Sequence, residues 1–75
     1  MKLSELGPGK AGKVTRIEGN PQARQRLQEM GLIRGTTVQF VRAAPLGDPL
    51  EVKVRGYSLS LRRSEAEGVT LEVSE

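Results

Sequence analysis

The chain contains no cysteine and no histidine. Without cysteine no disulfide can stabilise the core, and without thiolates or imidazoles a soft metal site is excluded. No apolar run approaches the length of about 18 residues that a transmembrane helix needs. Met1 and Lys2 are not followed by the apolar segment of a signal peptide. These absences predict a soluble, cytoplasmic protein.

Aromatic residues are also scarce, because Phe40 and Tyr57 are the only two and tryptophan is absent. Both lie in alternating segments whose pattern predicts side chains facing the core. Platforms for stacking nucleic-acid bases need exposed rings, so none is expected here. A nucleic-acid-binding small β-barrel nevertheless stays open as an alternative, because the chain is basic and Arg62 and Arg63 are adjacent.

The 75 residues carry a net charge of +3, but the charge is unevenly distributed along the chain. All 12 basic residues and 5 of the 9 acidic residues precede Glu65, whereas the last part of the chain is acidic. Mixed charge of this kind favours solubility, and it also leaves a basic surface that can attract an acidic partner. A chain of this length predicts one small domain, residues 1–75.

The clearest structural pattern lies in residues 50–61, LEVKVRGYSLSL. Apolar and polar residues alternate on both sides of Arg55-Gly56, which is the period of two half-buried strands. A two-residue turn at Arg55-Gly56 fixes the register, because a slip of one residue would set apolar side chains against polar ones. The expected facing pairs are Val54 with Tyr57, Val52 with Leu59, and Leu50 with Leu61.

A short helix is predicted over residues 21–30. Asn20 is a good N-cap and Pro21 suits the first helical position. Gly31 is placed to end the helix in the left-handed conformation, with Leu32 folding back onto Leu27. A helix of ten residues is too short to be stable alone, so it must pack on a sheet. Its apolar stripe consists of Ala23, Leu27 and Met30.

Three further strands are predicted over residues 12–19, 36–44 and 69–73, the first with a bulge near Thr15-Arg16. Residues 45–49, PLGDP, form a loop, because prolines at both ends cannot donate to a sheet ladder. Leu46 is left at the tip of this loop, and Ser64 is expected to cap a single helical turn. Five to six short strands with one inserted helix predict a mainly β fold, a small closed barrel.

Few residues suit catalysis or metal binding. Residues 7–13, GPGKAGK, match the first seven positions of a phosphate-binding P-loop, but Val14 stands where Ser or Thr is required. A strand-like segment follows instead of a helix, so we expect a glycine-rich turn. The carboxylates are scattered and form no calcium-loop or clustered metal pattern. The sequence predicts a protein that is not an enzyme and has no cofactor or metal site.

Taken together, the motifs resemble a known family. The segments LSELGPGKAGKVTRIEG and RLQEMGLIRGTTVQFVRAAPLGDPLEVKVRGYSLSLRRSEAEGV are similar to FeoA-type accessory proteins of bacterial ferrous iron transport. The resemblance implies an SH3-like barrel and a partner, the cytosolic part of the FeoB permease, bound by non-catalytic contact. It carries no catalytic motif to transfer. A similar domain ends iron-dependent repressors, so a stand-alone relative of that domain is a further alternative.

Apolar and charged residues at irregular backbone are the candidates for partner binding. They lie in the 45–49 loop, at the end of the predicted helix and after the hairpin. Leu32 and Leu46 can instead fold inward over the core; for Leu32 this alternative is favoured, and for Leu46 the two are evenly balanced. The expected partner-binding residues are Met30, Leu32, Leu46, Asp48, Arg62 and Arg63. Whether the contact activates or inhibits the permease, whether it depends on nucleotide, and the oligomeric state stay open at this level.

Overall fold

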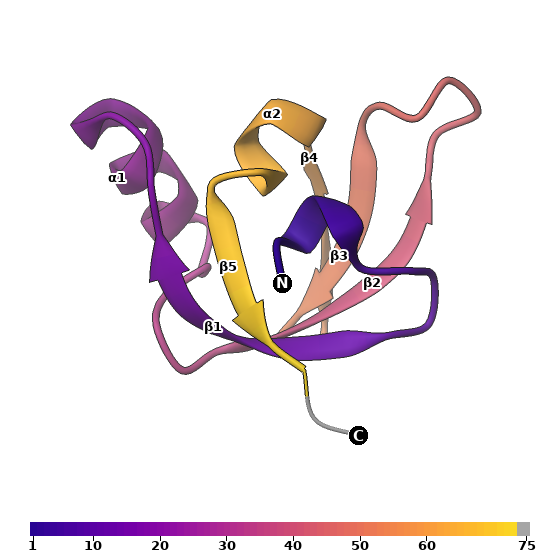
Figure 1. Cartoon of the computed structure of the whole chain (residues 1–75), viewed down its shortest axis with the longest axis horizontal. Coiled ribbons are helices and arrows are strands. Elements are labelled where there is room, and N and C mark those ends of the chain that lie inside the picture. Colours follow the sequence, from indigo (N-terminus) through magenta and orange to yellow (C-terminus); the bar gives the residue numbers. More distant parts are fainter. Residues whose placement is uncertain (74–75) are drawn as a thin grey trace.

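The computed structural model describes residues 1–73, and within them five antiparallel strands form one sheet (Figure 1). Along the sheet the strands follow the order β4-β3-β2-β1-β5. The fold is therefore mainly β with one short helix inserted after β1, as predicted. The expected closure of the sheet is not seen in the described residues, because β4 and β5 end the sheet and do not pair with each other. The elements are η1, a 3₁₀ turn (Leu3–Glu5), β1 (Ala11–Ile17), α1 (Pro21–Glu29), β2 (Thr37–Ala43), β3 (Leu50–Val54), β4 (Tyr57–Leu61), α2 (Arg63–Ala66) and β5 (Val69–Glu72).

The β3–β4 hairpin has the register that the alternating pattern predicts. Val54 pairs with Tyr57, Val52 with Leu59 and Leu50 with Leu61. Arg55 and Gly56 both have positive φ, 52° and 88°, as a type I′ turn requires. Arg55 is the only residue other than glycine with positive φ in residues 1–73, so the strands impose on it a conformation that arginine seldom adopts.

Two bulges bend the sheet. The register of β1 against β5 shifts between Val14 and Arg16, where a bulge was predicted. A second shift, in β2 against β3 between Phe40 and Arg42, gave no signal in the sequence. Each bulge adds a residue to one strand and increases its local twist.

Helix α1 has the predicted caps at both ends. The Asn20 Oδ1 accepts a hydrogen bond from the Ala23 N–H at 2.8 Å. At the other end the Gly31 N–H donates to the Gln28 carbonyl and the Leu32 N–H to the Leu27 carbonyl, both at 3.0 Å. Gly31 has φ 99°, so these contacts form a Schellman motif.

Helix α2 does not begin as predicted. Its N-cap is Arg62, and Ser64 is exposed within the turn. The Glu65 Oε1 accepts from the Arg62 N–H, and the Asp48 Oδ1 accepts from the Arg63 N–H, both at 3.0 Å. Two carboxylates therefore bind the N–H groups at the start of this turn, and one of them comes from the β2–β3 loop.

The core lies between the bent sheet and the helical turns. Leu27 and Leu32 enter it from α1 and the chain that follows, and Leu3 and Leu6 from the N-terminal segment. Figure 1 shows α2 and the N-terminal turn in the space between β5 and the β3–β4 hairpin. The remaining buried apolar residues are Val14, Val38, Phe40, Leu50, Val52, Val54, Leu61, Ala66, Val69 and Leu71.

The outer edge of β5 is covered by the start of the chain. Lys2 forms an antiparallel bridge with Thr70, and the Met1 amino group donates to the Leu71 carbonyl at 3.1 Å. These bonds satisfy backbone groups that an open sheet edge leaves exposed.

Candidate functional site

The loop between β2 and β3 presents one isolated apolar side chain. Leu46, at its tip, is 96% exposed. A single exposed leucine is common on protein surfaces, so its exposure alone indicates little. What distinguishes Leu46 is the way in which the rest of the loop is held.

Arg63 fixes this loop to the body of the protein. Its Nε donates to the Gly47 carbonyl at 3.0 Å, and a terminal guanidinium nitrogen donates to the Ser4 carbonyl at 3.3 Å. Its own backbone N–H donates to Asp48. One partly buried residue thus connects the loop, η1 and the start of α2. The loop is ordered before any partner binds, which lowers the entropy that binding must remove.

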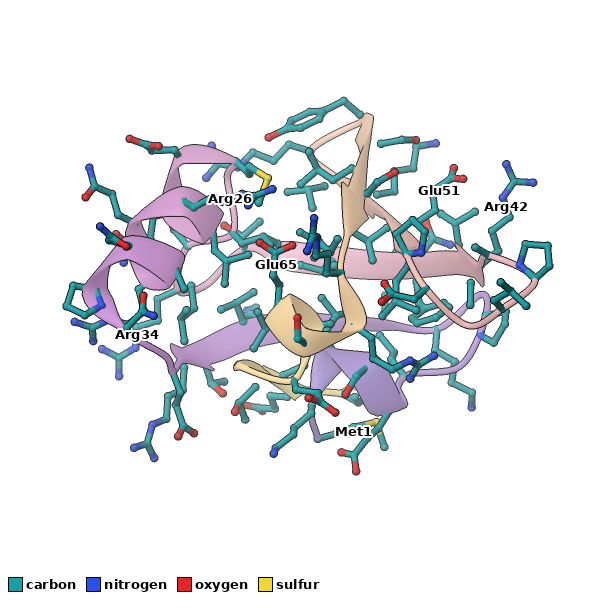
Figure 2. The ribbon with its side chains drawn as sticks, turned by 90° about the horizontal axis from the view of Figure 1, so that it is seen from above. Met1, Arg26, Arg34, Arg42, Glu51 and Glu65 are labelled. Carbon is teal, nitrogen blue, oxygen red and sulfur yellow. The ribbon has the colours of Figure 1, made fainter. Side chains whose placement is uncertain are left out.

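A shallow hollow of about 410 Å³ adjoins the loop. The ion pair of Arg42 and Glu51, with Nε 3.0 Å from Oε1, lies in its lining. Figure 2 shows this pair at the end of the molecule that is opposite Arg34 and α1. We call Leu46 together with the small apolar residues of the hollow the Leu46 surface; these residues are Ala43, Ala44, Pro45 and Pro49.

The structure brings together some of the predicted partner-binding residues and separates others. Asp48 and Arg63 are bonded to each other, and Arg62 is exposed beside them. Met30 is half-buried at the end of α1, and both views place α1 and the β2–β3 loop at opposite ends of the molecule (Figures 1 and 2). The six residues do not form one continuous surface.

Leu32 is not available to a partner. Its side chain is completely buried, because the Schellman motif turns it back over Leu27. The expectation that Leu32 contributes to a binding surface is therefore wrong, and the alternative that it covers the core is correct.

Tyr57 was expected to face the core but lies at its rim. The residue is 44% exposed, and its hydroxyl donates to the Met30 carbonyl at 2.6 Å. Tyr57 is the first residue of β4, so it lies at the end of the sheet, beside the C-terminal end of α1. The alternating pattern gives the side of the strand correctly, but it carries no information on how far the core extends along that side.

The described residues offer little for catalysis or metal binding. Within residues 1–73 no three side chains of His, Cys, Asp or Glu are grouped to hold a metal ion. Every buried side-chain nitrogen or oxygen in this part of the chain has a hydrogen-bond partner. None of the helices described has the length and apolar character that crossing a bilayer requires.

The arrangement is shared with several solved structures. The solution structure of the FeoA protein from Chlorobium tepidum is 48% identical, with a TM-score of 0.91, over 97% of this chain and 70% of that one. FeoA from Stenotrophomonas maltophilia, solved with zinc and described as an SH3 domain protein, is 34% identical with a TM-score of 0.82. That match covers 96% of this chain and 89% of the other. The fold is therefore that of a small SH3-like domain.

Sequence comparison then gives the family. Residues 1–73 match the FeoA domain, and the chain belongs to the FeoA domain family, which is accessory to ferrous iron transport. A curated relative from Porphyromonas gingivalis, the "Fe(2+) transport protein A/Fe(2+) transporter FeoB fusion protein", is 40% identical over 73 residues. The match covers 97% of this chain but only 9% of that relative.

A manganese-dependent transcriptional repressor also contains this fold. It superposes with a TM-score of 0.89 over 99% of this chain and 41% of the repressor, at 16% identity. At that identity the likeness extends to the fold alone. The family match favours the iron-transport interpretation over the repressor alternative.

Proposed function

We propose that this chain is a non-catalytic, cytosolic accessory protein of ferrous iron uptake that binds and regulates a FeoB-type permease by direct contact. The observation that carries the proposal is the relative from Porphyromonas gingivalis, whose name describes a FeoA protein and FeoB in one polypeptide. Fusion keeps two domains at high effective concentration, which is useful when they act on each other. The description of FeoA from Stenotrophomonas maltophilia as "Possibly Acting as a Bacterial Ferrous Iron Transport Activating Factor" agrees with this role.

The Leu46 surface is our candidate for the contact with the permease. Leu46 can enter an apolar pocket of a partner without rearrangement, because Arg63 and Asp48 already hold its loop. Apolar anchors on rigid backbone commonly dominate binding energy, while the surrounding polar residues set orientation. Arg62 is exposed beside the loop and provides a charge for such a rim. In this proposal Arg63 and Asp48 act by positioning the loop, and Met30 and Leu32 take no part.

A calorimetric titration of this chain with the permease's cytosolic domain tests the proposal. The double variant L46D/R62E removes both the apolar anchor and the rim charge, and we expect it to bind at least about thirtyfold more weakly. Its thermal stability should match that of the unchanged protein, because neither side chain makes an intramolecular bond in the part of the chain described.

Ile33 provides the matched control. It is 40% exposed, apolar, and lies just beyond α1, away from the loop, so I33D combined with K53E at an exposed lysine introduces the same change of charge elsewhere. If L46D/R62E binds as tightly as the unchanged protein, the Leu46 surface is the wrong site. If the unchanged protein shows no binding to the cytosolic domain, the proposed function itself is wrong.

A further inference from the structure

A second hollow, of about 420 Å³, opens between β1, α1 and the turn that leads into β2. Arginines from all three segments line it: Arg16 from β1, Arg24 from α1 and Arg34 from the turn. Figure 2 shows Arg34 beside α1, at the opposite end of the molecule from Arg42 and Glu51. The other lining residues are Val14, Thr15, Ile17 and Gln28. We call this site the arginine hollow.

The charge of the arginine hollow is not balanced from within. No carboxylate lines it. The positive charge of its three guanidinium groups is as large as the net charge of the whole chain, +3. In residues 1–73 neither Arg24 nor Arg34 has a salt bridge or a side-chain hydrogen bond. Arg16 approaches Glu18 at 3.6 Å, but both side chains are more than half exposed, and such pairs contribute little.

Three of the five arginines outside the hollow have side-chain partners. Arg26, two positions along α1 from both Arg24 and Gln28, pairs with Glu65 at 3.5 Å, and Arg42 pairs with Glu51. Arg63 donates to two backbone carbonyls. Arg55 and Arg62 are also unpaired among the described residues, but neither of them lines the arginine hollow. What is particular to the hollow is that three arginines from separate segments converge there, two of them unpaired.

Local geometry explains the convergence. Arg24 and Gln28 are four residues apart, so they lie on the same face of α1. The bulge between Val14 and Arg16 changes the direction of β1 next to that face. The Schellman motif at Gly31 then turns the chain back, which brings Arg34 to the same hollow.

We propose that the arginine hollow binds a compact phosphate-type oxyanion, such as the diphosphate group of a small phosphorylated molecule. Guanidinium groups match the geometry of phosphate oxygens and can form two parallel hydrogen bonds to them. A diphosphate concentrates several negative charges in one hollow, whereas the carboxylates of an acidic peptide are spread along a backbone. The volume falls in the range of roughly 300–1,000 Å³ that small-molecule sites have.

Gln28 can add to the recognition, whereas Thr15 cannot. The Gln28 side chain has no hydrogen bond to the described residues, so its amide can donate to a phosphate oxygen. The Thr15 hydroxyl instead donates to the Thr70 carbonyl at 3.3 Å, which leaves no proton for an anion. The inference does not depend on the proposed contact with the permease, because the Leu46 surface lies at the other end of the molecule.

The test is a titration of the ¹⁵N-labelled chain with inorganic pyrophosphate at low ionic strength. We expect shifts in the amide signals of residues 14–17, 24–28 and 34, with saturation. The variant R24Q/R34Q removes two charge-assisted contacts, so we expect its affinity to fall by at least about tenfold. K10Q/K53Q removes the same charge at two exposed lysines outside the hollow and should bind as the unchanged protein does.

Each result has a clear consequence. Absence of saturable shifts at these amides, or equal weakening by K10Q/K53Q and R24Q/R34Q, overturns the proposal. Preferential binding of an oligoglutamate peptide or a single-stranded oligonucleotide also overturns it, in favour of that class. Parallel titration with GDP identifies the source of the phosphate: tighter binding than pyrophosphate indicates a nucleotide, and equal binding indicates that the phosphates alone are recognised.

Discussion

The Tyr57 hydroxyl donates a hydrogen bond of 2.6 Å to the Met30 carbonyl. Tyr57 opens β4 and Met30 is the C-cap of α1, so this bond connects the edge of the hairpin to the end of the helix. Carbonyls at a helix C-terminus have no partner within the helix. The tyrosine satisfies one of them and helps to hold a helix that is too short to persist alone.

Replacing Tyr57 by phenylalanine removes this bond and keeps the ring. Because Tyr57 is partly exposed, water can replace the lost donor, so we expect destabilisation of only about 0.5–1 kcal/mol. Urea unfolding measures the change, and amide hydrogen exchange should accelerate at the C-terminal end of α1. S60A, an exposed position in the same strand, is the control and should leave both unchanged. Unaltered exchange in Y57F contradicts a role for the bond in holding α1.

Replacing Gly31 by alanine should lower the stability of the fold more than the small size of a methyl group suggests. Its φ of 99° is strained for any residue with a Cβ, and that Cβ would lie 2.5 Å from the Tyr57 hydroxyl oxygen. The left-handed backbone alone disfavours alanine by roughly 1–2 kcal/mol. We expect the free energy of unfolding to fall by more than this in G31A, and by less when the change is made in a Y57A background. Equal losses in the two backgrounds would show that Tyr57 does not restrict this position.

Removing the Arg63 side chain should loosen the Leu46 loop. R63A loses the bonds to the Gly47 and Ser4 carbonyls, for which we expect a loss of about 1.5–3 kcal/mol. R63K keeps the charge but lacks the planar group that reaches both carbonyls, so it should not restore stability. NMR relaxation of the amides of residues 45–49 reports the mobility. R62A, the neighbouring exposed arginine, should change neither quantity, and a rigid loop in R63A would contradict the assignment.

Leu32 and Leu46 form a matched pair of leucines with opposite environments. Leu32 is 0% exposed and Leu46 is 96% exposed. Truncation of a buried leucine to alanine typically lowers stability by about 2–5 kcal/mol, whereas exposed positions change it by less than about 0.5 kcal/mol. Thermal unfolding of L32A and L46A should show this contrast. If L32A does not fold, L32V provides a milder truncation, and a melting temperature equal to that of L46A would contradict burial of Leu32.

Local signals in the sequence were sufficient for the β3–β4 hairpin and for α1. The register of the β3–β4 hairpin follows from alternation and the Arg55-Gly56 turn, and the caps of α1 follow from Asn20 and Gly31. Each of these contacts joins residues that are near one another in the sequence, so the local pattern is enough to predict it. The resemblance to FeoA proteins also agrees with the family match to residues 1–73.

The relations between distant segments could not be predicted in this way. Asp48 accepts a hydrogen bond from the Arg63 N–H at the start of α2, although 15 residues separate the two. The arginine hollow likewise requires β1, α1 and the following turn to meet. Alternation along one strand cannot reveal which distant carbonyl or helix end will lie beside a given side chain.

The sequence by itself determined that this protein is a small mainly β domain, because alternation, turn chemistry and caps act over short distances. The FeoA type followed separately, from the resemblance of its motifs to that family. Only the tertiary structure decided which candidate residues are accessible. It buries Leu32, places Tyr57 at the rim and leaves Leu46 exposed on an anchored loop, because burial depends on how the bent sheet and its helices pack.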